Sequence, residues 1–182
     1  TYYIGGPGAD RLDGGNSRIN DWGDWSSSPS AIQIDMPNGT CHGGDAEGDV
    51  LIGIENVIGS AFDDYIRAGD PWTDRAVLVG NAGADTLDGG GVATTVLYAF
   101  DPAGTSVNLK LGFATDGYGD RDVLLNVSNA EGSGFADAII GTDSKNKLSG
   151  GAGNDSISGE AGNDFLAGGL GTRIAEESTV RP

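Results

Sequence analysis

Single apolar residues recur every nine positions in the C-terminal third of the chain, and a glycine follows each of them two residues later. These residues are Ile139, Leu148, Ile157 and Leu166. Three residues are just long enough for a short strand with one inward side chain, and glycine takes the positive φ angles that tight turns require. The pattern therefore predicts short strands that alternate with tight turns.

The turns have a constant composition. Counting in nines from Gly132 gives four consecutive units, GSGFADAII, GTDSKNKLS, GGAGNDSIS and GEAGNDFLA, which cover residues 132–167. Glycine holds position 1 throughout, and position 6 reads Asp137, Asn146, Asp155 and Asp164. Two units make a coil of 18 residues, which places Asp137 beside Asp155 and Asn146 beside Asp164 on strands about 4.8 Å apart. The template recurs at 5–13 and 80–88 and, more weakly, at 59–67.

A longer repeat encloses the short one. Residues 5–70 and 80–143 share an order of motifs at an offset of 75 early and 73 late. Each copy carries a stretch of alternating polarity (AIQIDM, SVNLKL) and an acidic loop (GGDAEGD, DGYGDRD). We expect one solenoid over residues 1–170, with the regular nonapeptide roll at 132–169 and a disordered polar tail at 171–182.

Charge identifies the class of ligand. The chain has 33 glycines in 182 residues and 27 acidic against 10 basic side chains, for a formal charge of -17. This balance argues against nucleic acid and anionic membrane surfaces as partners and favours cations. No apolar run is long enough to span a membrane, and one cysteine, Cys41, excludes an internal disulfide framework. The N-terminus does not resemble a signal peptide, so we expect a fragment of a longer protein or export without such a signal.

The stacked carboxylates favour calcium. Two carboxylates about 4 Å apart repel by roughly 1 kcal/mol in water and about 4 kcal/mol at an effective dielectric of 20. Calcium accepts six or more oxygens at about 2.3–2.6 Å and tolerates irregular geometry better than magnesium, so an ion between coils can join carboxylates and turn carbonyls. Because the site does not exist in the extended chain, binding of several calcium ions should be coupled to folding.

The candidate calcium ligands come from the turns. Two predicted pairs are Asp137 with Asp155 and Asn146 with Asp164. A third is Asp64 with Asp85, which are 21 residues apart and would pair if three residues near 68–70 bulge out. Asp10 has no acidic mate 18 residues on, where Ser28 stands. For Asp10, the roles of calcium ligand and of ordinary turn residue that caps its own backbone are equally compatible with the sequence. The further candidates from the turns are Gly8, Gly83, Gly151, Gly153, Asn154, Gly162 and Asn163.

The nonapeptide resembles G-G-x-G-x-D-x-U-x, the calcium-binding repeat of RTX (repeats-in-toxin) proteins. The resemblance covers most of residues 5–169 and is strongest at 132–167. It implies an all-β fold, a right-handed parallel β-roll or β-solenoid with glycine-aspartate calcium-binding turns. It also implies a secreted or cell-surface bacterial protein whose parent uses a type I secretion apparatus.

Two functions are compatible with these features. The first is a non-catalytic calcium module that folds after export. The alternative is an accessory solenoid that binds extracellular polysaccharide, because such repeats resemble those attached to alginate epimerases, lipases and metalloproteases. A sugar-stacking surface could be formed by Trp22, Trp25 and Trp72. The sequence favours instead that these aromatic residues cover the flank or the ends of the solenoid. His42 and Cys41 lack the partners of a zinc or nucleophilic site, so we expect no catalysis within this chain.

Overall fold

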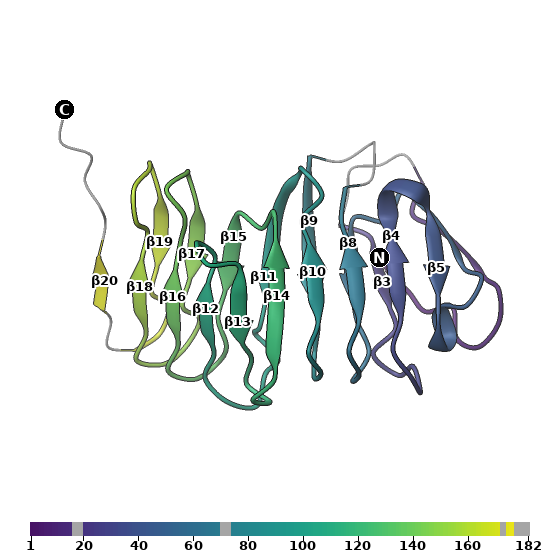
Figure 1. Ribbon diagram of the computed structural model, residues 1–182, viewed down its shortest axis with the longest axis horizontal. Coiled ribbons are helices and arrows are strands. Elements are labelled where there is room, and N and C mark those ends of the chain that lie inside the picture. Colours follow the sequence, from purple (N-terminus) through teal and green to yellow (C-terminus); the bar gives the residue numbers. More distant parts are fainter. Residues whose placement is uncertain (16–19, 70–73, 172–173, 177–182) are drawn as a thin grey trace.

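The computed structural model describes residues 1–15, 20–69, 74–171 and 174–176, and these fold almost entirely as short strands. Figure 1 shows the strands stacked along the long axis, from the N-terminal region (purple) at one end to β18, β19 and β20 at the other. The described strands form one sheet of eight and one of twelve. No helix in these ranges is long and apolar enough to cross a membrane.

The eight-stranded sheet is parallel throughout. Its strands, in spatial order, are β1 (Tyr2–Tyr3), β3 (Trp22–Asp24), β7 (Asn56–Ile58), β9 (Arg75–Val79), β11 (Ala93–Leu97), β15 (Asn129–Glu131), β17 (Lys147–Ser149) and β19 (Phe165–Ala167).

The twelve-stranded sheet is mixed. Its strands, in spatial order, are β2 (Arg11–Asp13), β6 (Val50–Ile52), β5 (Thr40–His42), β4 (Gln33–Asp35), β8 (Tyr65–Arg67), β10 (Thr86–Asp88), β14 (Arg121–Leu125), β13 (Phe113–Thr115), β12 (Ser106–Asn108), β16 (Ala138–Ile140), β18 (Ser156–Ser158) and β20 (Ile174–Glu176). Short 3-10 helices at Met36–Asn38 and Gly44–Ala46 flank β5.

The chain alternates between the two sheets in the regular part of the roll, so strands two apart in sequence pair in parallel. Ile139 pairs with Ile157 and Leu148 with Leu166, each 18 residues on. This register confirms the predicted parallel roll, since one coil takes two nonapeptides. The middle residue of each three-residue strand points inward, as the sequence pattern predicted.

Two antiparallel insertions interrupt the parallel pattern, and the sequence did not predict them. In the first long repeat, β5 runs antiparallel to both β4 and β6. In the second, β13 runs antiparallel to β12 and β14. The acidic loops of the two copies close the hairpins that join β5 to β6 and β13 to β14. Each insertion adds strands to the twelve-stranded sheet only, which explains its larger size.

One hydrophobic cluster fills the space between the sheets. Its members include the middle residues of many strands, such as Ile66, Leu87, Leu148 and Ile157. Burying one such side chain stabilises a fold by about 1.5–3 kcal/mol. Gly23, in the middle of β3, is an exception because the indole ring of Trp25 lies where its Cβ would stand.

The end of the chain differs from the expected disordered tail. Within residues 171–182, Ile174–Glu176 form β20, which pairs in parallel with β18. The edge of β18 offers unpaired backbone groups, and pairing satisfies them even where the nonapeptide register has ended. The rest of the predicted tail, at 172–173 and 177–182, lies outside the described residues.

Candidate metal centres

The residues at position 6 of the nonapeptides stack in files, and hydrogen bonds join them along each file. The backbone N–H of Asp137 donates to Oδ1 of Asp155 at 3.1 Å, and that of Asn146 donates to Oδ1 of Asp164 at 2.8 Å. The structure therefore brings both predicted pairs together. It also commits one oxygen of each second carboxylate to the neighbouring strand, which the sequence did not predict.

The same ladder continues through the irregular region. The N–H of Asp64 donates to Oδ1 of Asp85 at 2.8 Å, so the predicted third pair lies in register. Nine residues separate Arg67 from Val77 where six separate Ile140 from Lys147, so this connection is three residues longer. The predicted bulge near 68–70 lies partly outside the described residues, because residues 70–73 are not described.

Asp10 has an acidic neighbour, although not at the spacing of 18 residues. Its N–H donates to Oδ1 of Asp49 at 2.8 Å. Asp49 lies 39 residues on rather than 18, because the strands β4 and β5 come between the two residues in the sequence. The insertion, which the nine-residue count does not include, hid this pairing.

Glycine at position 1 is required by the carboxylate of its own turn. A Cβ on Gly132 would lie 2.5 Å from Oδ2 of Asp137, and one on Gly159 would lie 2.5 Å from Oδ2 of Asp164. Real Cβ atoms do not approach so closely. The acidic side chain is therefore folded inward against the first residue of its turn, and its burial depends on that residue having no side chain.

The remaining predicted ligands lie on the same turns. Five glycines have positive φ angles: Gly8 (130°), Gly83 (113°), Gly151 (86°), Gly153 (129°) and Gly162 (140°). Such conformations turn successive backbone groups toward one region, as in other ion-binding loops. The side chains of Asn154 and Asn163 are exposed, unlike the carboxylate of Asp155, so only their backbone carbonyls are suited to a buried ion.

The residue at position 2 divides the turns into two classes, which we call closed and open. In closed turns it is serine or threonine, and its backbone N–H and hydroxyl both donate to the side chain at position 6. Ser133 donates to Asp137 at 2.8 and 2.9 Å, and Ser60 donates to Asp64 at 2.6 and 2.7 Å. Thr142 donates to Asn146 at 2.7 and 3.2 Å.

In open turns position 2 has a positive φ angle, and the acidic oxygen of the turn is left free. These residues are Asn81 (70°), Gly151 (86°) and Glu160 (64°), and they precede Asp85, Asp155 and Asp164 respectively. Oδ2 of each of these three aspartates is buried and accepts no hydrogen bond. Gly6, at φ 75°, gives the Asp10 turn the same backbone conformation. Each predicted pair therefore joins one closed turn with one open turn.

Burial makes the free carboxylates of Asp85 and Asp155 costly to ionise without a cation. Burial, together with the nearby charges of Asp122, Asp64 and Asp116, raises the pKa of Asp85 to about 9. Burial is also the main cause of the raised pKa of Asp155, with the charge of Asp137 adding to it. A divalent cation next to Oδ2 would reverse this preference, because it favours the ionised form.

The free oxygens fit calcium in chemistry. Carboxylate and carbonyl oxygens are its preferred ligands. In the described ranges, no three acidic, histidine or cysteine side chains form a ready-made site. An ion here would therefore take one or two carboxylates and complete its shell with backbone carbonyls and water. That composition is the one that the glycine-rich turns offer.

The structure also assigns the other residues singled out in the sequence. Trp25 is buried and its Nε1–H donates to Oδ2 of Asp49 at 3.1 Å, so it cannot stack on a sugar. Trp22 stacks on Tyr2 with ring centroids 5.7 Å apart, and Trp72 lies outside the described residues. Cys41 is buried, which raises its pKa to about 12 and suppresses its reactivity.

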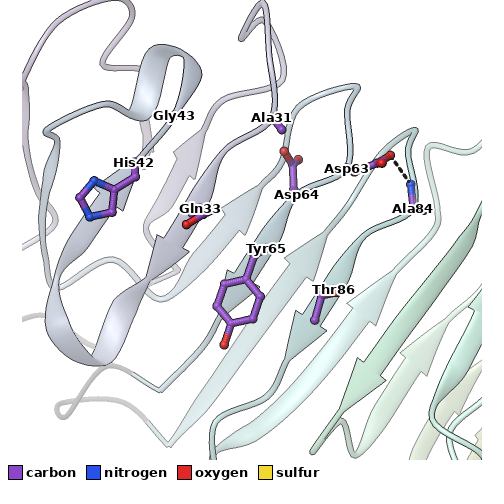
Figure 2. A pocket seen from close by; sticks show the side chains of 9 residues that line it. All are labelled: Ala31, Gln33, His42, Gly43, Asp63, Asp64, Tyr65, Ala84 and Thr86. Atoms are coloured by element: carbon purple, nitrogen blue, oxygen red, sulfur yellow. Dashed lines mark hydrogen bonds between the residues drawn. The ribbon is translucent and has the colours of Figure 1, made fainter.

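A shallow hollow of about 380 Å³ lies on the outer face of the twelve-stranded sheet. Figure 2 shows the side chains of Gln33, Tyr65 and Thr86 on neighbouring strands, with His42 beyond Gln33. Asp63 lines the hollow and accepts a hydrogen bond from the N–H of Ala84 at 2.9 Å. This hollow combines an exposed aromatic ring with polar side chains, on the face opposite the core.

Stacked coils, glycine turns and inward carboxylates with free oxygens define a parallel β-solenoid with cation-binding turns. A family model, the RTX calcium-binding nonapeptide repeat, matches the chain in four copies at residues 3–18, 76–93 and 131–174. These segments of the chain are therefore RTX repeats of the calcium-binding kind. The matched segments include the Asp10 and Asp85 turns and the regular roll, but not the closed turn of Asp64. No curated protein matches the chain.

Proposed function

We propose that this chain is a non-catalytic module of a secreted bacterial protein, and that it folds when calcium fills its open turns after export. The observation that supports the proposal most is the set of buried, unpartnered Oδ2 atoms on Asp85, Asp155 and Asp164. None of the ion pairs in the described residues includes these aspartates. A cation from solution supplies the missing charge.

The proposal distinguishes between the turns. In closed turns the serine or threonine donates two hydrogen bonds to the side chain at position 6, so these turns depend less on an ion than open turns do, although burial still raises the pKa of Asp64. Open turns leave a carboxylate oxygen without a partner, and this oxygen costs free energy until a cation binds it. Calcium sites are therefore expected at the turns of Asp85, Asp155 and Asp164, with the Asp10 turn as a fourth.

The difference in calcium concentration between the inside and the outside of the cell explains why folding would depend on calcium. The cytosol is poor in calcium, so the chain stays extended there and suits export through a type I secretion apparatus, as its RTX repeats imply. Outside the cell, calcium at about 10⁻⁴–10⁻³ M is in the range that extracellular calcium modules bind. Folding is then confined to the compartment in which the protein works.

A circular dichroism titration tests the proposal. The chain in chelator should gain β-structure on addition of calcium and gain much less with magnesium. Asp155→Asn and Asp164→Asn should each lower the apparent calcium affinity, while Asp143→Asn, which neutralises an exposed aspartate of a closed turn, should not. An identical spectrum in chelator and in millimolar calcium would falsify the proposal.

A second candidate function is the binding of extracellular polysaccharide, and the hollow shown in Figure 2 favours it. Sugars bind to sites that pair an aromatic face with hydrogen-bonding side chains, and Tyr65, Gln33 and Thr86 offer both. Binding to neutral glycans on an array should disappear in Tyr65→Ala and persist in Phe165→Ala, which removes an exposed ring from the other sheet. Equal binding by the two variants, or none by the parent chain, would exclude this candidate.

A further inference from the structure

The acidic hairpin between β13 and β14 packs directly against the open turn of Asp85. The N–H of Gly83 donates to Oδ2 of Asp120 at 3.3 Å, and the N–H of Asp85 donates to Oδ1 of Asp122 at 3.0 Å. The hairpin therefore stands where the turn of the next coil would stand in a regular roll. It lies outside the segments matched by the calcium-binding repeat.

Asp116, at the start of this hairpin loop, has one oxygen in use and one free. Its Oδ1 accepts the N–H groups of Tyr118 at 3.1 Å and Asp120 at 2.7 Å. Its Oδ2 is buried and accepts no hydrogen bond, and the residue as a whole is only 2% exposed. The hairpin thus carries a second buried, free carboxylate oxygen, close enough for the charge of Asp116 to raise the pKa of Asp85.

Two more buried aspartates surround this pair. Oδ2 of Asp122 accepts the hydroxyl of Tyr98 at 2.8 Å, and Oδ2 of Asp101 accepts the N–H of Gly117 at 2.7 Å. None of the ion pairs in the described part of the chain includes Asp85, Asp101, Asp116 or Asp122. Four buried carboxylates without a basic side chain require protons or a bound cation.

The first long repeat provides an internal comparison at an offset of 73. There, Trp25 takes the place of Tyr98 and donates to Asp49, the counterpart of Asp122. Ser28 stands in place of Asp101, and its hydroxyl oxygen accepts the N–H of Asp45 in the loop.

The position of Asp116 is occupied by Gly43 in the first copy. Gly43 has a φ of 78°, and a Cβ there would lie 2.6 Å from the carbonyl oxygen of Ala31. The first hairpin therefore cannot carry a side chain at this point. At these two positions the second copy carries acidic residues, Asp101 and Asp116, where the first copy has Ser28 and Gly43.

We propose that a calcium ion binds at the β13–β14 hairpin, beside the Asp85 turn, with the free oxygen of Asp116 as its carboxylate ligand. Asp122 and Asp101 contribute negative charge around the ion, and their oxygens keep the hydrogen bonds that hold the hairpin. Calcium is favoured over magnesium because the remaining ligands are backbone carbonyls and water in an irregular loop. This site rests on the calcium binding proposed above and adds a ligand from outside the nonapeptide.

Counting bound calcium in the full chain by equilibrium dialysis tests the site. Asp116→Asn keeps the shape of the side chain and should lose one ion per chain, or weaken one site at least tenfold. Glu47→Gln is the matched control, because it removes one charge from the corresponding loop of the first copy and should keep the full count. Asp116→Gly, which restores the residue of the first copy, should behave as Asp116→Asn does.

The outcomes separate the two proposals. A parent chain that binds no calcium would overturn the proposed function, and this site with it. A parent chain that binds calcium and folds, with an unchanged count and affinity in both Asp116 variants, would overturn this site alone. Circular dichroism in saturating calcium verifies that each variant is folded, and the second variant replaces the first if one of them is not.

Discussion

Replacing Asp85 with asparagine should stabilise the calcium-free roll at neutral pH while weakening its response to calcium. Burial raises the pKa of Asp85 from 3.8 to about 9. Between these two values the folded chain holds a proton that the unfolded chain has released. Stability is therefore fully present below about pH 4 and is lost as pH rises toward about 9.

The size of the effect follows from the same shift. Each pH unit above the unfolded pKa costs about 1.4 kcal/mol, so Asp85 costs about 4 kcal/mol at pH 7. Asparagine removes the ionisation and keeps an oxygen for the N–H of Asp64. Its amide must replace the free Oδ2 in a buried position, which costs about 1–3 kcal/mol if it finds no acceptor. The net gain in stability is therefore about 1–3 kcal/mol.

The amount of β-structure that the chain retains in chelator, followed by circular dichroism against pH, measures this gain, because on the proposed function the calcium-free parent chain is largely unfolded at neutral pH. The parent chain should be more stable near pH 5 than near pH 8, and Asp85→Asn should flatten that dependence. Burial also raises the pKa of Asp122 to about 7 and that of Asp101 to about 6, so part of the dependence remains in the variant. A calcium-free parent chain that is equally or more stable near pH 8, or a variant that is less stable than the parent at pH 7, would refute the reasoning.

Three further predictions address the turns, the core and the buried thiol. Gly132→Ala should destabilise the calcium-bound roll by about 1–3 kcal/mol because its Cβ meets Asp137, whereas Gly134→Ala, with open space around it, should be neutral when both are compared by urea titration in calcium. Leu148→Ala should cost about 2–5 kcal/mol, measured as a lower urea midpoint in calcium. Cys41 should resist a thiol reagent at pH 8 in calcium and react in chelator; rapid labelling in both would contradict its burial.

The regular roll could be predicted from the sequence because one spacing governs both strand and turn. Nine residues between Leu148 and Ile157 place their side chains inward on opposite sheets, and eighteen residues between Ile139 and Ile157 place them side by side. No other register keeps the apolar residues inside. Wherever the nine-residue count held, the sequence therefore predicted the pairs of strands in the structure.

The antiparallel hairpins could not be predicted by that count. AIQIDM and SVNLKL alternate in polarity as any strand with one buried face does, and alternation alone does not give the direction of pairing. A local signal was present in the first copy, where Asn38-Gly39 follows β4. Gly39 has a φ of 62° there, and Asn-Gly is a strong hairpin dipeptide. The partner of Asp10 could be identified only once this hairpin was known.

The distinction between closed and open turns was visible in the sequence at position 2, but its meaning needed the structure. Ser60, Ser133 and Thr142 read as ordinary polar turn residues until their hydroxyl groups are seen to donate to the side chain four residues on. Asn81 and Glu160 read the same way until their positive φ angles are known. Backbone conformation at one residue decides whether the carboxylate of the turn is satisfied.

Closed and open turns lie next to each other along the roll, and this arrangement bears on how calcium can fold the chain. Asp64 is closed beside the open turn of Asp85, and Asp137 is closed beside the open turn of Asp155. A closed turn satisfies its own side chain without metal, and its backbone N–H holds the carboxylate of the open turn. An ion that binds the open turn therefore meets a carboxylate that is already fixed on one side, so less conformational entropy is lost on binding. Replacing Ser133 with alanine should on this reasoning weaken calcium binding at the neighbouring Asp155, although Ser133 itself would never contact the ion.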